Sequence, residues 1–231
     1  MSPGSRVSPS SRVRPRFPRI LPDGDAARAD AVGLLRAGGI VAVPTDTVYG
    51  IAADMALPDA IERLFAAKRR PPEKAVAVLL ADAAQAEALG VVGPAARVLG
   101  ERFWPGGLTL VLPVRPGARL PRALAGGAPT IGVRVPDHPA PRALAAVLGP
   151  LPTTSANVSG EPDARDAQEI ASRLGDALAL VIDGGPIHGG PASTVVDCTG
   201  ERPMIRRVGA IAREEIARVL AEAGLELSAG E

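Results

Sequence analysis

The hydrophobic and polar positions of this chain form alternating helical and extended patterns from about residue 25 onward. Residues 26–37 place their apolar side chains on one helical face, and this stretch ends at Gly38-Gly39. Pro58 suits the first turn of a second helix, which runs out at Lys68. Further helices are predicted near residues 83–89, 94–103, 139–147 and 166–174, with a final amphipathic helix at 216–223.

Short apolar runs between these helices predict the strands. They lie at residues 40–43, 75–80, 108–114, 130–135, 178–183, 194–197 and 204–208. Because helices and strands alternate, the predicted fold class is α/β or α+β. The chain has 231 residues, 46% of them hydrophobic, and no internal repeat, which favours a single domain with one sizeable core.

The N-terminal segment differs in composition, being rich in Ser, Pro and Arg. We predict a disordered tail at 1–22, a folded domain at 23–224 and a short C-terminal tail at 225–231. The first segment lacks the apolar core of a secretory signal or anchor. No later run approaches the roughly 18 to 20 apolar residues that span a bilayer. A soluble, cytoplasmic protein is therefore expected.

Charge and residue counts narrow the classes of function. Lys and Arg number 26 against 25 Asp and Glu, so the net charge of +1 indicates neither nucleic acid nor membrane as a partner. Aromatic residues make up only 2%, which argues against a surface that stacks bases. His138, His188 and Cys198 are too few for a structural zinc site, and we predict structural or surface roles for all three.

A polar loop, Pro-Thr-Asp-Thr-Val-Tyr-Gly at 44–50, directly follows the strand predicted at 40–43. Pro44 lacks a backbone donor and Gly50 permits positive φ, so the loop is either an ordinary turn between strands or one wall of a site. Tyr49 either packs under the loop or closes on a ligand. Asp46 and Asp54 are expected to have solvent or turn roles.

Three further polar stretches are individually ambiguous. Residues 68–70, Lys-Arg-Arg, suit a helix C-terminus, which favours cations. Residues 153–160 are rich in hydroxyl and amide groups and suit either a cap or a binding turn. The glycine-rich stretch 184–194 has neither the P-loop order nor the dinucleotide-binding order.

The order of the motifs is more informative than any one of them. They are Pro44-Thr45-Asp46-Thr47-Val48-Tyr49-Gly50, Lys68-x-Arg70-Pro71, Phe103-Trp104-Pro105-Gly106, Val133-Arg134-Val135-Pro136, Ser155-Ala156-Asn157, Ser193-Thr194-Val195-Val196-Asp197 and Arg207-Val208-Gly209. This series closely resembles the YrdC/Sua5 family, the threonylcarbamoyl-AMP synthases, over about residues 25–215. The chain looks like the short, single-domain form. The resemblance implies a YrdC-like twisted mixed sheet flanked by helices, with a concave basic cavity.

The resemblance also implies a nucleotidyltransferase that condenses L-threonine, bicarbonate and ATP into L-threonylcarbamoyl-AMP and pyrophosphate. This is the first step of the t6A modification of tRNA. Two anionic partners must meet in this reaction, so positive charge and positioning are its main requirements. Mg2+ is expected to arrive with the ATP phosphates rather than at a dedicated metal site. A downstream tRNA threonylcarbamoyltransferase complex and weak binding of tRNA or double-stranded RNA are the expected further partners.

Site residues follow from the same motif match. On the nucleotide side the resemblance implies Lys68, Arg70, Lys74, Thr130, Ser155, Asn157, Asp163 and Arg207, of which Lys68, Arg70, Ser155 and Asn157 are the catalytic set. On the threonine side it implies Thr47, Arg134, Thr153 and Ser193, with the planar fork of Arg134 on the carboxylate of threonine.

The chain departs from the family pattern at three positions. Leu79 stands where many members have a threonine-contacting histidine, Gly107 replaces a common proline, and Asp163 replaces a frequent serine. Two alternative functions remain. One is a carbamoyltransferase domain of hydrogenase maturation or antibiotic biosynthesis, and the other is an RNA-binding protein without catalytic activity.

Overall fold

The computed structural model describes residues 18–68, 76–121, 124, 128–187 and 190–228. Its helical segments are α1 (Asp25–Arg36), α2 (Pro58–Ala67), α3 (Ala84–Leu89), α4 (Pro94–Phe103), α5 (Pro139–Leu148), α6 (Ala167–Leu174), the 3-10 turn η2 (Gly175–Ala177) and α7 (Arg213–Glu222). Its strands are β1 (Arg19–Pro22), β2 (Val41–Val43), β3 (Gly50–Ala52), β4 (Ala77–Leu79), β5 (Leu108–Pro113), β6 (Thr130–Arg134), β7 (Leu151–Ser155), β8 (Leu180–Asp183), β9 (Thr194–Asp197) and β10 (Met204–Arg207).

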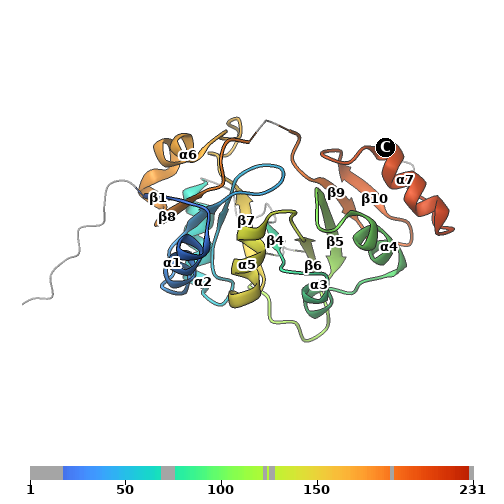
Figure 1. The fold of residues 1–231 in the computed structure, drawn as a ribbon. Coiled ribbons are helices and arrows are strands. Elements are labelled where there is room, and N and C mark those ends of the chain that lie inside the picture. Colours follow the sequence, from blue (N-terminus) through green and yellow to red (C-terminus); the bar gives the residue numbers. More distant parts are fainter. Residues whose placement is uncertain (1–17, 69–75, 122–123, 125–127, 188–189, 229–231) are drawn as a thin grey trace, which may run out of the picture.

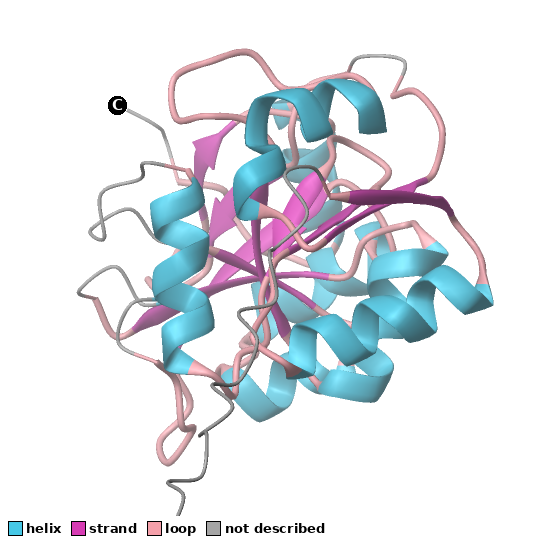
Figure 2. Cartoon of the chain, turned by 90° about the vertical axis from the view of Figure 1, so that its left-hand side faces the viewer, coloured by secondary structure: helices cyan, strands magenta, loops and turns pink. Residues whose placement is uncertain are grey.

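These strands form one mixed sheet in the order β1-β8-β2-β3-β7-β4-β6-β5-β9-β10 (Figure 1). The pairs β1/β8, β2/β8, β4/β6 and β5/β9 are parallel, and the other neighbours are antiparallel. Helices flank the twisted strands on both sides (Figure 2). The predicted α/β fold class with a mixed sheet is therefore confirmed.

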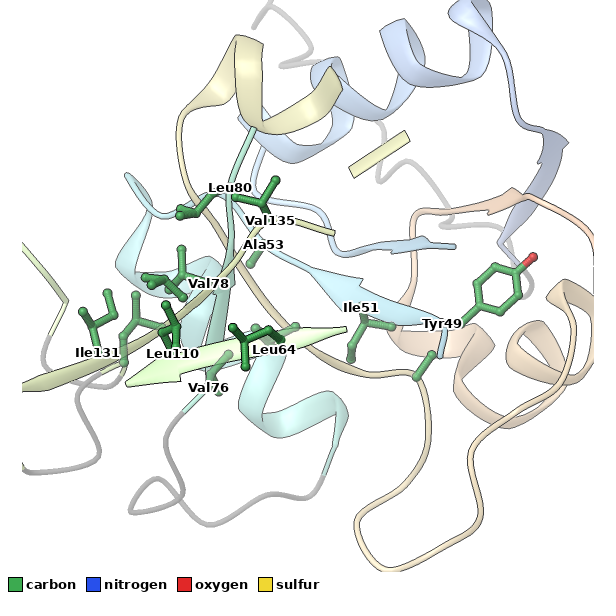
Figure 3. Packing of buried hydrophobic residues seen from close by; sticks show 14 of the residues in the cluster. Tyr49, Ile51, Ala53, Leu64, Val76, Val78, Leu80, Leu110, Ile131 and Val135 are labelled. Atoms are coloured by element: carbon green, nitrogen blue, oxygen red, sulfur yellow. The ribbon is translucent and has the colours of Figure 1, made fainter. Parts of the chain in front are cut away.

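Side-chain alternation gives the sheet two different faces. On one face, Val78 of β4, Leu110 of β5 and Ile131 of β6 join the larger core cluster, which also takes in Leu64 of α2 (Figure 3). All four side chains are at most 1% exposed. Burial of such aliphatic side chains contributes roughly 1.5 to 3 kcal/mol each.

The opposite face is covered by helices over only part of its width. Leu35 of α1 and Leu144 of α5 pack there in a second cluster with Val41 of β2 and Leu180 of β8. Strands β4, β6, β5 and β9 continue the same face beyond these two helices. The part of the face that they leave open contains the candidate site.

The sequence located most elements to within two residues at each end but gave no bounds for three strands, β1, β3 and β7. β3 has only three residues and begins with glycine, so its own alternation signal is too short to recognise. β1 was assigned to the N-terminal tail, and that boundary is wrong. Residues 19–22 pair in parallel with β8, and the Arg19 side chain forms an ion pair with Asp30 at 2.8 Å. This segment is a strand only because it pairs with β8 in the folded protein.

The C-terminal boundary also differs from the prediction. Leu225 and Leu227, expected in a tail, are partly buried against the larger core cluster. Among the described residues, none of the helices has the length and apolar character needed to cross a membrane.

His138 is the N-cap of α5, as its predicted structural role requires. Its Nδ1 accepts a hydrogen bond from Ala140 N at 3.1 Å. Burial lowers the pKa of His138, with Asp23, Asp46 and Asp137 acting against that effect and Arg28 adding to it. His188 lies outside the described residues.

This cap predicts a pH dependence of stability. Because the folded pKa is depressed, the unfolded chain binds the proton more readily, and stability is lost as pH falls through about 6.5, the unfolded value. A protonated Nδ1 cannot accept the Ala140 bond, so the loss should approach the value of an N-cap, about 1 kcal/mol. His138→Asn keeps an acceptor that does not titrate, and its melting temperature should fall less between pH 7.5 and 5.5. Equal pH slopes for both proteins would contradict this assignment.

Candidate functional site

A cavity of about 460 Å3 lies over the open part of the sheet. Its floor comes from alternate residues of neighbouring strands: Thr130, Gly132 and Arg134 of β6, with Ala77 and Leu79 of β4. Thr130 and Arg134 stand at opposite ends of this floor, four residues or about 13 Å apart along the strand. The small and apolar side chains between them leave room for an elongated ligand with polar ends.

The loop at 44–50 connects β2 to the antiparallel β3 and also contributes to the cavity wall. Thr45 organises it: Thr45 Oγ1 accepts the N–H groups of Thr47 and Val48 at 3.1 and 3.2 Å and donates to Val48 O at 2.6 Å. The loop is therefore a turn between strands, and two of its residues, Thr45 and Val48, line the cavity.

Tyr49 packs beneath this loop and is not among the described residues that line the cavity. It is 1% exposed, donates its O–H to Gly185 O at 2.8 Å and accepts from Gly184 N at 3.0 Å. Burial, as the largest cause, raises the pKa of Tyr49 to about 12. Of the two roles considered for Tyr49, the structure supports packing.

Arg134 occupies one end of the cavity with a fixed orientation. Its Nε donates to Gly106 O at 2.9 Å, Nη1 to Thr47 Oγ1 at 2.7 Å and Nη2 to Asp46 Oδ1 at 2.7 Å. The residue is 5% exposed, and burial lowers its pKa while Asp46 opposes that effect. A guanidinium has five N–H groups, so two remain, one on each Nη.

Two predictions about the loop are refined by this arrangement. Asp46 was expected to have a solvent or turn role; the residue is exposed, and in addition it has two fixed partners. Its carboxylate forms an ion pair with Arg134 and also accepts Asp137 N at 2.9 Å. Thr47 lies behind the guanidinium and not among the residues lining this cavity. Asp54 has the predicted turn role, accepting Ala56 N at 2.9 Å.

Lys68, Ser155 and Asn157 form a second polar cluster. Lys68 is 2% exposed, and its Nζ donates to Ser155 O at 2.8 Å, Ser155 Oγ at 2.9 Å and Asn157 Oδ1 at 2.5 Å. Ser155 and Asn157 line the cavity, whereas Lys68 supports them from below. Asn157 Nδ2 also donates to Glu161 O at 2.5 Å, which closes the turn after β7. Arg70 and Lys74 lie outside the described residues.

A third cluster joins Arg207 to Ser193 and Thr109. Arg207 donates through Nε and Nη2 to Ser193 O at 3.1 and 2.9 Å, and through Nη2 to Ser193 Oγ at 3.2 Å. Ser193 Oγ lies 2.8 Å from Thr109 Oγ1. The sequence did not single out Thr109, although it is the one polar side chain in the otherwise apolar β5.

The remaining predicted site residues, Thr130, Thr153 and Asp163, also line the cavity. Arg134, Arg207 and Asp163 are the charged residues in the described part of its lining. Cys198 is partly buried away from this lining, and burial raises its pKa to about 12. Within the described residues there is no group of three or more His, Cys, Asp and Glu side chains that could hold a metal ion.

The fold and site together define an α/β protein with a cavity on the open part of a mixed sheet, and guanidinium groups are part of the cavity lining. The Sua5/YciO/YrdC family model, described as telomere recombination, matches residues 33–209. The chain belongs to this family.

Individual relatives support the same assignment. The chain is 42% identical over 200 residues to the threonylcarbamoyl-AMP synthase of Bacillus subtilis, covering 85% of this chain and 57% of that protein. A relative from Mycobacterium tuberculosis is 41% identical over 191 residues, covering 82% of this chain and 87% of its own length. The crystal structure of Pyrococcus abyssi Sua5 complexed with L-threonine superimposes with a TM-score of 0.82 at 35% identity, covering 92% of this chain and 62% of that one. The chain therefore spans little more than half of the Bacillus relative.

Proposed function

We propose that this protein synthesises L-threonylcarbamoyl-AMP from L-threonine, bicarbonate and ATP, releasing pyrophosphate, as the first step of tRNA t6A modification. The name of the Bacillus relative and the L-threonine in the Pyrococcus structure support the proposal. The observation that carries it is the presence of two different polar ends in one cavity, Arg134 at one and the Ser155–Asn157 turn at another. The reaction needs both ends, one for the amino acid and one for the nucleotide.

At the first end, Arg134 is the group for the carboxylate of L-threonine. Its two remaining N–H groups suit a carboxylate, and Asp46, Thr47 and Gly106 hold the guanidinium so that little side-chain entropy is lost on binding. With the carboxylate anchored there, the amine of threonine attacks the carbon of bicarbonate. A C–N bond forms, water leaves, and an N-carboxylate results.

At the nucleotide end, the turn held by Lys68 presents the Ser155 hydroxyl and the Asn157 amide to ATP. An oxygen of the N-carboxylate attacks the α-phosphorus, and the bond to the pyrophosphate leaving group breaks. The protein supplies position and charge, because the nucleophile belongs to the substrate. Thr130, Asp163 and Arg207 complete this side, and predicted roles for Arg70 and Lys74 fall outside the described residues.

Mg2+ would neutralise phosphate charge when ATP is bound. Asp163 is the one carboxylate in the described lining of the cavity, so we propose that phosphate oxygens supply most of the ligands. A cytoplasmic location, transfer of the product to a tRNA threonylcarbamoyltransferase complex and weak RNA binding remain predictions of the family assignment.

Pyrophosphate release from ATP and bicarbonate, measured with and without L-threonine, tests the proposed function. Release should depend on L-threonine, and the product should carry label from 14C-bicarbonate. Pyrophosphate release that does not depend on L-threonine would contradict the proposed function. RNA binding that survives high salt, in a protein without this activity, would instead support the RNA-binding alternative.

A further inference from the structure

Two hydroxyl groups meet on the cavity floor beside Arg134. Thr109 and Ser193 are 5% and 6% exposed, line the cavity, and have oxygens 2.8 Å apart. Since the antiparallel β5–β6 ladder pairs Leu110 with Val133, Thr109 lies alongside Arg134 on the neighbouring strand. The hydroxyl pair therefore lies between Arg134 at the end of β6 and Arg207 at the end of β10.

A count of donors shows what the pair offers to a ligand. Thr109 and Ser193 have two O–H donors, and the hydrogen bond between them uses one. Ser193 Oγ also accepts from Arg207 Nη2. Whichever hydroxyl donates within the pair, the other keeps a hydrogen that has no acceptor among the described residues. Arg207 polarises the pair and strengthens this donor.

We propose that the Thr109–Ser193 hydroxyl pair, with Arg207 behind it, is the subsite for bicarbonate and for the N-carboxylate formed from it. This inference rests on the function proposed above. The donor would hold one oxygen of the ion while the amine of threonine forms the C–N bond and a hydroxyl group leaves as water. The product carboxylate then keeps the same donor as it turns to the α-phosphorus.

The charges around the pair favour a small oxyanion over a neutral group. The charge of Arg207 reaches Arg134, because it adds to the burial that lowers the Arg134 pKa. Two guanidinium groups that repel each other both gain from an anion placed near them. The neutral alternative is the side-chain hydroxyl of the substrate L-threonine. The separate KM values for L-threonine and bicarbonate distinguish these two ligands.

Thr109→Val is the sharpest test, because valine keeps the shape of threonine and removes only the hydroxyl. Valine also keeps the Thr109 methyl group, which lies beside Gly132 of β6. We expect the KM for bicarbonate to rise about 10-fold, with the KM values for L-threonine and ATP changed less than about twofold. Thr109→Ser keeps the donor and should restore a bicarbonate KM near wild type.

Thr199→Val is the matched control, because it removes an exposed hydroxyl that donates to Asp197 Oδ1 at 2.6 Å, outside the cavity lining. Its kinetics should match wild type. A Thr109→Val variant in which the KM for L-threonine rises, and that for bicarbonate does not, would overturn the proposal and assign the pair to the amino acid. Melting curves of both Thr109 variants separate loss of folding from loss of the subsite.

Binding without turnover distinguishes failure of this inference from failure of the proposed function. The probe is 13C-bicarbonate, whose NMR line should broaden with wild type and Thr109→Ser and much less with Thr109→Val. Broadening by wild type without threonine-dependent pyrophosphate release would reject the proposed reaction but keep the oxyanion subsite. Equal broadening by all three proteins would reject the subsite.

Discussion

Replacing Lys68 with methionine is expected to lower kcat/KM for ATP by about 100-fold, because small displacements of positioning groups have effects of this size. Methionine fills similar space but cannot donate to Ser155 and Asn157, which line the cavity. The loss of these charge-assisted bonds should also lower the free energy of unfolding by about 1.5 to 3 kcal/mol. Steady-state kinetics with varied ATP and a urea titration measure the two effects.

Arg63→Met is the matched control for the Lys68 variant. Arg63 belongs to α2, whose C-cap is Lys68, and its guanidinium donates to Gly38 O at 2.9 and 3.1 Å, away from the cavity lining. This variant should lose stability but keep the wild-type KM for ATP. A Lys68→Met enzyme with unchanged kcat/KM would show that the position of Ser155 and Asn157 does not depend on the ammonium. Ser155→Ala, which removes only a neutral hydroxyl, should have a smaller effect than Lys68→Met.

Replacing Arg134 with lysine should raise the KM for L-threonine about 100-fold while the KM for ATP changes little. The side chain makes three directed bonds from a planar fork and still has N–H groups for a carboxylate, and an ammonium cannot reproduce that geometry. Asp46→Asn should give a smaller increase, about 10-fold, because the fork keeps its bonds to Thr47 and Gly106. Initial rates with varied L-threonine at saturating ATP check both values.

Arg206→Lys controls for the loss of an arginine fork outside the cavity. Arg206 donates through Nε and Nη2 to Asp197 Oδ2 at 3.0 and 2.8 Å, with its side chain 57% exposed. Kinetic constants should be unchanged in this variant, since exposed ion pairs contribute little. Equal increases in the KM values for threonine and ATP in Arg134→Lys would contradict a role confined to the amino-acid end.

The loop at 44–50 shows which features the local sequence can predict and which it cannot. Its proline, glycine and hydroxyl residues predict a turn, and Thr45 forms one through bonds within the loop. The same residues could not predict that Asp46 pairs with Arg134, 88 positions along the chain. A carboxylate in a polar loop is usually solvated, and only the approach of β6 gives this one a buried partner.

The sequence by itself determined the α/β class, most element positions and, through the order of its motifs, the family. Helical and strand periods and the turn residues are local properties that a linear chain expresses directly. The tertiary structure alone decided that β1 belongs to the sheet, that Lys68 supports Ser155 and Asn157 from below, and that Thr109 joins Ser193 and Arg207. Each of these features depends on strands or side chains that are far apart in sequence. The order of strands in the sheet brings them together, and that order cannot be predicted from the local sequence of the paired residues.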